Sequence, residues 1–314
     1  MNYKKYAAIG LSLAMFLTAG CGGDKKAENT AKAFASIKDA AGKTVVLQKA
    51  PERVVTIGAS LLGLIDAVDG KIVGRCATRV AEIPDSMKKV PEVGDMGNIN
   101  TESVVSLKPD LVIGLRNQHS KFAKVFEGNK INFVMMQPKT FDEVKQSLSM
   151  LGEIFGKQAK AKEVCDKLDN DIKAITSKLP KEKHRVVVMF ASAKNVTVQG
   201  TDSIAGCVCN ILGLDVVTKK SAKAEKTPYS MEALLEANPE HIFVTTMGKP
   251  AEIENRLKKD FKDNPAWASL DAVKNNRVHV LPENLFLLNP GLKYPQAVEL
   301  MAKLVYPEAM KDAK

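Results

Sequence analysis

Cationic and amide side chains follow several short apolar runs in this chain. Runs such as Leu111–Ile113 and Val186–Phe190 are rich in β-branched residues, which is typical of strands buried on both faces of a parallel sheet. Ligands bind outside the carboxyl ends of the strands in open α/β sheets, so we expect the side chains of these turns to line one cleft. The candidate ligand-binding residues are Arg75, Arg79, Arg116, Asn117, His119, Lys194, Asn195 and Lys249. Because arginine can hold a carboxylate or a phosphate with two hydrogen bonds, this set predicts an anionic ligand.

The chain lacks the residue patterns of common catalytic sites. No Gly-x-Gly-x-x-Gly sequence follows a predicted strand, and the stretch Gly152–Gln158 is one residue short of a phosphate-binding loop and lacks its Ser or Thr. No Ser/His/Asp set and no pair of carboxylates stands out either. A doubly wound fold alone does not exclude an enzyme, since it hosts many chemistries. The residues favour a binding protein with no intrinsic cofactor.

Cysteine usage indicates packing rather than metal binding. Four cysteines follow Cys21, namely Cys76, Cys165, Cys207 and Cys209. The Cys-x-Cys pair has no histidine nearby, whereas zinc sites usually need Cys-x-x-Cys pairs or clustered histidines. We interpret all four as small buried hydrophobic residues, and a single disulfide between two of them is the alternative. No metal site is predicted.

The chain contains an internal duplication. The segment Asn100–Ile113 recurs 130 positions later as Ser230–Phe243. Both copies keep a glutamate (Glu102 and Glu232), an apolar pair, a proline, an acidic residue and an apolar strand in register. In each copy an N-cap residue opens a short helix, which ends at proline because the residue before proline is pushed out of the α region. The repeat predicts two halves of one design.

Strands alternate with helices in both halves. This alternation predicts an α/β protein of two doubly wound, mostly parallel-sheet lobes joined by one long α-helix. Thr140-Phe141-Asp142-Glu143 is a capping box that begins an amphipathic helix, and Gly156 interrupts it. A second apolar stripe from Lys157 to Leu179 would form a helix about 34 Å long. Such a helix could bridge two lobes along their shared flank; the alternative is a helix packed wholly on one lobe.

The N-terminus has the form of a secretory signal. Lys4 and Lys5 precede the apolar stretch Ala7–Leu17, which is too short to span a bilayer as a helix. Leu-Thr-Ala-Gly-Cys at positions 17–21 resembles the bacterial lipobox, so Cys21 is the predicted lipidation site. We therefore expect an exported protein, anchored by lipid at the extracytoplasmic face of a bacterial membrane (periplasm or cell surface). The alternative is a soluble exported protein in which Cys21 is incidental.

These signals divide the chain into five segments. They are a signal peptide (1–20), a lipid-anchored tether (21–36), an N-terminal α/β lobe (37–155), a linking helix (156–180) and a C-terminal α/β lobe (181–314). The formal charge is +10, and removal of Lys4 and Lys5 with the signal leaves +8. The lysines are scattered without interleaved aromatic residues, so nucleic acid is not an expected partner. Anionic lipid or an anionic ligand fits this charge.

Together these features resemble the substrate-binding proteins of ATP-driven (ABC) importers for ferric siderophores, haem and vitamin B12. The resemblance runs from Pro51-Glu52-Arg53-Val54-Val55 to Leu304-Val305-Tyr306-Pro307-Glu308. Its most family-like stretches are Asn100–Ile113 and Tyr294–Glu308. In that family one rigid long helix joins two α/β lobes. The resemblance implies a monomeric lipoprotein that captures a metal chelate (ferric siderophore, haem or corrinoid) between its lobes and delivers it to an ABC permease.

The resemblance also implies a docking role for two acidic residues. One glutamate on each lobe of these proteins contacts arginines of the permease, and the matching residues here are Glu102 and Glu232. Two acids at equivalent helix starts would set the orientation of a basic partner. An acid near a helix N-terminus also complements the helix dipole, so a purely structural role is the alternative.

His119 is the histidine that falls on a predicted cleft loop. Its imidazole could ligate haem iron or a corrinoid cobalt, whereas His184, His241 and His279 are interpreted as structural. The turn Gly58–Gly63 departs from the Pro-Ser-x-x-Glu-like turn of many family members, so ligand identity does not transfer. The rival functions are binding of a free transition metal, and a surface adhesin or sensor that uses the same fold without a transporter.

Overall fold

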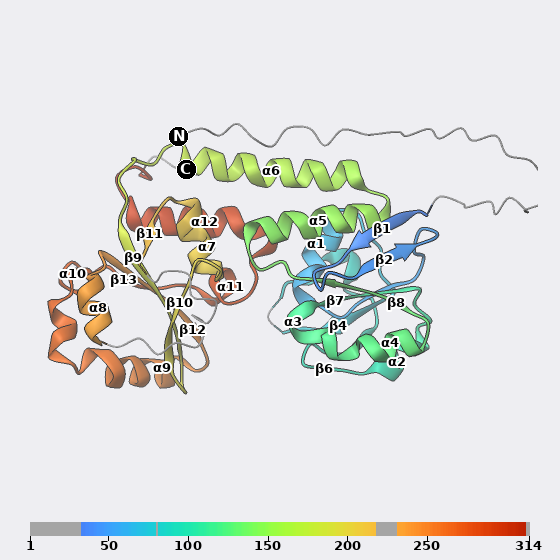
Figure 1. The fold of residues 1–314 in the computed structure, drawn as a ribbon, viewed down its shortest axis with the longest axis horizontal. Helices are drawn as coiled ribbons and strands as arrows, with labels where there is room; N and C mark the ends of the chain where they lie inside the picture. Colours follow the sequence, from blue (N-terminus) through green and yellow to red (C-terminus); the bar gives the residue numbers. More distant parts are fainter. Residues whose placement is uncertain (1–32, 80, 218–230, 312–314) are drawn as a thin grey trace, which may run out of the picture. The chain divides into compact units, whose positions relative to one another are not determined.

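A six-stranded sheet organises the N-terminal half of the chain, residues 37–155 (Figure 1). The computed structural model describes residues 33–79, 81–217 and 231–311, so the predicted signal peptide, Cys21 and most of the tether lie outside the described residues. The strand order is β6-β5-β4-β3-β7-β8, in which β6 is antiparallel to β5 and all other neighbours are parallel. The strands are β3 (Val54–Thr56), β4 (Gly74–Ala77), β5 (Glu92–Asp95), β6 (Asn98–Ile99), β7 (Leu111–Leu115) and β8 (Asn132–Met136). A separate antiparallel hairpin precedes them, formed by β1 (Ala35–Lys38) and β2 (Thr44–Leu47).

A five-stranded sheet organises the C-terminal half, residues 181–314. Its strands are β9 (Arg185–Ser192), β10 (Val196–Gln199), β11 (Asp215–Val216), β12 (His241–Met247) and β13 (Val278–Val280). β9 pairs in parallel with β11 and β12, β12 pairs in parallel with β13, and β10 forms an antiparallel hairpin with β9. Among the described residues, no strand of one sheet pairs with a strand of the other.

The helices follow the strands in alternation, as the sequence predicts. They are α1 (Leu62–Ala67), α2 (Thr101–Ser106), α3 (Arg116–His119), α4 (Ala123–Gly128), α5 (Phe141–Phe155), α6 (Gln158–Thr176), α7 (Ile204–Ile211), α8 (Met231–Ala237), α9 (Pro250–Leu257), α10 (Asp271–Lys274), α11 (Glu283–Phe286) and α12 (Tyr294–Val305). Short 3-10 or π turns lie at 59–61, 85–87, 120–122, 258–262, 265–269 and 291–293.

Burial explains the composition of the central strands. Every residue of β7 is buried, and so is every residue of β12 except the last. Parallel strands covered on both faces read as continuous apolar runs, which is how the sequence revealed them. The runs predicted at 111–113 and 186–190 are found within β7 and β9. The predicted class of an α/β protein with two mostly parallel sheets is confirmed.

The capping box predicted at Thr140 is present at the start of α5. Thr140 Oγ1 accepts a hydrogen bond from the backbone N–H of Glu143 (3.3 Å), and the Glu143 carboxylate accepts one from the backbone N–H of Thr140 (2.8 Å). Gly156 ends the helix with a φ of 64°, a left-handed conformation that glycine adopts without a steric penalty.

Helix α6 is the long helix that the sequence predicts between the halves. It packs against α5 of the N-terminal half and against α12 of the C-terminal half (Figure 1). The helix spans 19 residues, about 28 Å, rather than the predicted 34 Å, because the chain turns at Ser177. The described residues from Ala33 onward form one compact unit, and the exact limits of the two lobes stay a prediction.

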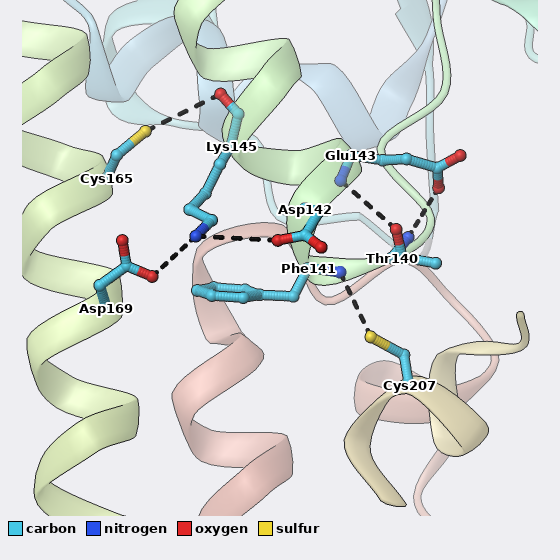
Figure 2. A network of polar contacts seen from close by, with 8 residues as sticks. All are labelled: Thr140, Phe141, Asp142, Glu143, Lys145, Cys165, Asp169 and Cys207. Carbon is cyan, nitrogen blue, oxygen red and sulfur yellow. Dashed lines mark hydrogen bonds and ion pairs between the residues drawn. The ribbon is translucent and has the colours of Figure 1, made fainter. Parts of the chain in front are cut away.

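Polar and aromatic contacts connect the two halves beside α5, and Figure 2 shows one of them, between Phe141 and Cys207. The backbone N–H of Phe141 donates to Cys207 Sγ of α7 at 3.5 Å. Tyr294 of α12 donates its hydroxyl to the carbonyl of Lys139 at 2.7 Å, and its ring lies 5.5 Å from that of Phe141. These contacts, which we call the joint, fix the N-terminus of α5 against the C-terminal half.

The four cysteines within the described residues carry free thiols. Cys76 and Cys209 are buried, and Cys165 and Cys207 are partly buried. Burial raises the pKa of the Cys76 thiol to about 11 and also raises that of Cys209. The thiols therefore stay protonated at neutral pH and serve as packing groups, and the alternative of a disulfide is not realised.

Candidate functional site

A pocket of about 700 Å³ lies where loops of the N-terminal half face a segment of the C-terminal half. We call it the cleft pocket. The N-terminal half contributes Ala59, Ser60, Gly63, Leu64, Asp66, Ala81, Glu82, Pro84, Met96, Leu115, Asn117, Gln118, Gln137, Pro138 and Lys139. The C-terminal half contributes Ile204, Asn284 and the run 287–293. The pocket therefore needs both halves.

Sheet topology places the N-terminal wall of the cleft pocket. Ala59 and Ser60 follow β3, Asn117 and Gln118 follow β7, and the 137–139 turn follows β8. These strands are parallel neighbours, so their carboxyl ends meet at one edge of the sheet. The predicted position of the ligand cleft thus coincides with a real pocket.

The chemistry of the cleft pocket differs from the cationic set that the sequence suggested. Its polar groups are mainly amides, from Asn117, Gln118, Gln137, Asn284 and Asn289. Its apolar groups are Leu64, Met96, Leu115, Ile204, Leu287, Leu288 and Leu292. An apolar lining with a few fixed hydrogen-bonding groups is typical of sites for small organic ligands.

Charged side chains occur on both walls of the cleft pocket. Glu82 of one wall and Lys293 of the other form an ion pair, with Oε2 and Nζ 3.0 Å apart. Asp66 also lines the pocket and accepts a hydrogen bond from Ser86 Oγ at 2.5 Å. Lys139 completes the charged lining beside the joint.

Of the eight predicted ligand residues, Asn117 lines the cleft pocket. Arg116 instead lines a neighbouring groove of about 650 Å³ between α5 and the end of β1. Its guanidinium donates to the carbonyl of Ala40 (3.3 Å) and to Asn117 Oδ1 (3.3 Å). Gln137 borders both cavities, so Arg116 lies on the far side of the wall that Gln137 helps to form.

Arg75 is held inside the N-terminal half. The side chain is buried, donates to the carbonyls of Met87 (3.1 Å) and Cys76 (3.3 Å), and pairs with Glu92 at 2.9 Å. A buried guanidinium whose donors are engaged stabilises its loop. We therefore give Arg75 a structural role.

His119 is fully buried behind the wall of the cleft pocket. The backbone N–H of Leu115 donates to Nδ1 (2.9 Å), so Nε2 carries the proton and donates to the carbonyl of Met96 (3.0 Å). Burial lowers the pKa of His119, which keeps the ring neutral. Both nitrogens are occupied, so His119 positions two lining residues and has no lone pair to offer a metal.

The remaining predicted ligand residues, Arg79, Lys194, Asn195 and Lys249, lie outside the lining of the cleft pocket. Arg79 is exposed on the loop before Ala81. Lys194 and Asn195 form the β9–β10 turn, where Ser192 Oγ donates to Asn195. Lys249 precedes α9 and pairs with Glu252 at 3.6 Å. The structure thus does not gather the predicted set at one place.

The second wall, which comes from 284–293, overlaps the segment Glu283–Gly291 that the sequence predicts as one of the cleft loops. The run Asn284–Lys293 contains two asparagines, four leucines and a proline, which marks an irregular segment. That signal predicts a loop, and its place after a strand assigns it to the cleft. It does not show which residues of the N-terminal half the loop meets. The approach of Lys293 to Glu82 joins positions 211 residues apart and is a tertiary feature.

The predicted docking glutamates occupy equivalent positions in the two halves. Glu102 and Glu232 are exposed at the second residue of α2 and α8. Asn100 caps α2 by accepting from the backbone N–H of Ser103 at 3.0 Å, as predicted, whereas Ser230 lies outside the described residues.

The duplication extends to the hydrogen bonds that hold α2 and α8. The Arg53 side chain donates to the carbonyl of Leu107 (2.7 Å), and the Asp110 carboxylate accepts from the backbone N–H of Arg53 (3.0 Å). In the second copy Arg185 donates to the carbonyl of Ala237 (3.4 Å), and Glu240 accepts from the backbone N–H of Arg185 (3.1 Å). The residues before the prolines, Lys108 and Asn238, have φ values of 48° and 35°.

A model of a known protein family matches most of this chain. The family model described as "periplasmic binding protein" matches residues 26–285. The chain belongs to the periplasmic binding protein family. The predicted resemblance is thereby confirmed.

Relatives in this family cover most of the chain. It is 30% identical to the uncharacterized ABC transporter substrate-binding lipoprotein YvrC of Bacillus subtilis, across 98% of this chain and 100% of YvrC. It is 27% identical to the high-affinity heme uptake system protein IsdE of Staphylococcus aureus, across 82% of this chain and 88% of IsdE.

Solved structures share the fold. The crystal structure of Staphylococcus aureus IsdE complexed with heme aligns with a TM-score of 0.68 at 25% identity, covering 81% of this chain and 98% of IsdE. Staphylococcus aureus SirA complexed with staphyloferrin B aligns with a TM-score of 0.71 at 22% identity, covering 86% of this chain and 98% of SirA.

Membership of this family indicates both the class of protein and its location. Periplasmic binding proteins are the solute-binding components of ABC transporters, so this chain is a binding protein and not an enzyme, as the sequence predicts. An extracytoplasmic location agrees with the family and with the lipoprotein relative. Within residues 33–311, the described helices include none that is long and apolar enough to cross a bilayer. Among the residues that the structure describes, no group of three or more His, Cys, Asp or Glu side chains could hold a metal ion.

Proposed function

We propose that this chain captures a metal chelate in the cleft pocket and delivers it to the permease of an ABC importer. The candidates are a ferric siderophore, haem and a corrinoid. The observation that carries the proposal is the pocket itself, since about 700 Å³ suits an organic ligand rather than a bare ion. The haem-uptake relative IsdE supports the same class of cargo.

Lining chemistry supports an organic ligand as well. The amides of Asn117, Gln118 and Asn289 can donate to or accept from a chelate, and Leu287 and Leu288 can cover its apolar surface. A transported metal enclosed by its chelator brings its own ligands, so the receptor recognises the periphery of the chelate.

A blocking variant tests the pocket. A Cβ at Gly63 of α1 meets no atom within 4 Å, so Gly63→Phe would fit the fold and fill the pocket. Gly128→Phe is the matched control, because a Cβ there is equally free and the site lies on α4, outside the pocket lining. Absorption and thermal-shift titrations would use haemin, ferric citrate, ferrichrome and cyanocobalamin, with ZnCl₂ and MnCl₂ as free ions.

We expect at least one chelate to bind, and Gly63→Phe to weaken it at least about tenfold while Gly128→Phe does not. Binding of a free ion alone would favour the rival transition-metal receptor. Failure of every chelate to bind would overturn the proposal.

We further propose that Glu102 and Glu232 dock the receptor on the permease. Both are exposed at equivalent positions of α2 and α8, one in each half. The double variant Glu102→Arg/Glu232→Arg should abolish uptake of radioactive iron and leave chelate affinity intact. Glu127→Arg/Glu236→Arg, which changes two other exposed glutamates, is the matched control. Uptake that survives the first double variant would contradict the docking role.

Cys21 is the proposed lipid anchor. Cys21→Ala should abolish incorporation of radioactive palmitate and release the protein from the membrane fraction. Retention of the label would place the acyl group elsewhere.

A further inference from the structure

The ion pair between Glu82 and Lys293 links the two walls of the cleft pocket. Glu82 lies on the loop after β4, and Lys293 comes directly before α12. Their side chains meet at 3.0 Å, and both residues line the pocket. A contact between the two walls of a ligand pocket must be accommodated or broken when a ligand fills the space between them.

The two partners are held to different degrees. Lys293 precedes Tyr294, which is fully buried and donates its hydroxyl to the Lys139 carbonyl at 2.7 Å in the joint. Lys293 N–H also donates to the carbonyl of Pro290 at 2.8 Å. The Glu82 side chain is 79% exposed, against 45% for Lys293. The lysine therefore has the better-held backbone and the less exposed side chain, so the glutamate is the partner that can leave more easily.

The surroundings of Lys293 suit an incoming anion. Asn289 and Asn284 line the same wall and can donate hydrogen bonds to a carboxylate. Asp66, the other acidic residue of the lining, accepts a hydrogen bond from Ser86. When Glu82 leaves, the ammonium of Lys293 loses this counter-ion and gains a site for one oxygen of a ligand.

We propose that the Glu82 carboxylate occupies the position that an anionic group of the chelate takes when it binds, and that the Lys293 ammonium binds that group. Binding of an anionic chelate exchanges the Glu82 carboxylate for a carboxylate of the ligand, whereas a neutral chelate leaves the pair in place. This inference rests on the proposed function and adds the charge class of the ligand. It also makes Glu82 a selectivity residue, because every ligand that uses Lys293 must compete with it.

Opposite effects of two neutralising substitutions test this exchange. Glu82→Gln removes the carboxylate that competes with the ligand, so it should strengthen binding of an anionic probe. Lys293→Gln removes the ammonium that binds the ligand anion, so it should weaken binding of that probe. Because the pair is largely solvent-exposed, each change is expected to be about 1.5- to 5-fold. If the pair were only structural, both substitutions would shift the affinity in the same direction.

Probes that differ in charge complete the design. Haemin carries two propionates and its dimethyl ester carries none; ferric citrate is anionic and ferrichrome is neutral. The anionic members should respond to both substitutions, and the neutral members should change less than the anionic ones. The exposed pair Lys249–Glu252, outside the pocket lining, supplies the controls Lys249→Gln and Glu252→Gln, for which no change is expected. Thermal midpoints of all four variants show whether they fold.

The outcomes separate this inference from the proposed function. If wild type binds a probe and the two pocket variants shift together, or if neutral probes respond as strongly, the exchange is wrong and the receptor function stands. If wild type binds none of the four probes or cyanocobalamin, the receptor function fails and the exchange fails with it.

Discussion

Burial decides the role of individual polar residues in this protein. Arg75 and His119 carry groups that could bind a ligand, yet both side chains are buried and hydrogen-bonded to backbone carbonyls. A buried donor without a partner is costly, so the fold uses such groups to fix its own loops. Exposed residues with uncharged amide side chains, such as Asn117 and Gln118, line the cleft pocket instead.

The histidines of the C-terminal half form a contact cluster. His241 Nδ1 lies 3.2 Å from His279 Nε2, and His184 Nδ1 lies 2.8 Å from Glu240 Oε2. His241 Nε2 is buried without a hydrogen-bond partner. Burial, followed by the neighbouring His279, Arg277 and His184, lowers the pKa of His241 to about 4, against an opposing influence of Glu240.

This shift predicts acid sensitivity. The unfolded chain takes up a proton on His241 near pH 6.5, whereas the folded chain resists it until about pH 4. Between these values the unfolded state binds more protons, so the stability contribution is complete above about pH 6.5 and falls as the pH drops toward 4. The loss is up to about 3 kcal/mol.

His241→Phe tests the prediction by urea unfolding between pH 4 and 7.5. The variant should lose less stability across this range than wild type, because the ring that resists protonation is gone. Parallel curves for the two proteins would show that other groups cause the acid sensitivity.

At the scale of single elements, local sequence signals and local structure agree closely. The capping box at Thr140, the Gly156 stop and the two short helices that end before proline were all predicted and are present. Each depends on residues within about one helical turn, so no long-range contact is needed to define it.

Glycines in two helices are expected to respond to alanine with opposite signs. A Cβ at Gly63 of α1 meets nothing within 4 Å, so Gly63→Ala should stabilise the protein by about 0.5–1 kcal/mol. A Cβ at Gly206 of α7 would lie 2.1 Å from the carbonyl oxygen of Gly200, so Gly206→Ala should destabilise it by more than about 1 kcal/mol. Denaturant unfolding measures both; equal signs would contradict the packing described for α7.

At the scale of the whole described unit, the joint and α6 hold the two halves together. α6 packs on both α5 and α12, and the joint lies beside the cleft pocket. A continuous helix resists wide hinge motion, so we expect the pocket to be largely formed before ligand binds and closure to be modest.

Small-angle scattering with and without a chelate that binds tests this stiffness. Wild type should show little change in radius of gyration. Tyr294→Phe removes the 2.7 Å hydrogen bond to the Lys139 carbonyl, so it should reduce stability by about 1–2 kcal/mol and allow a larger compaction on binding.

Tyr306→Phe is the matched control for that measurement. Tyr306 makes a similar bond to the carbonyl of Glu182 (2.8 Å), but within the C-terminal half. It should lose comparable stability without changing the response to ligand. A large compaction of wild type would contradict a stiff connection.

The sequence by itself determined the α/β class, the duplicated helix–proline–strand unit and the long helix between the halves. These features depend on periodicity and capping, which neighbouring residues specify. Only the tertiary structure decided which side chains form the pocket. Arg116 turns into a separate groove, His119 is buried, and Lys293 reaches Glu82 from 211 residues away. A pocket is built from segments distant in the chain, and the packing of both halves, not any local pattern, determines which of them face each other.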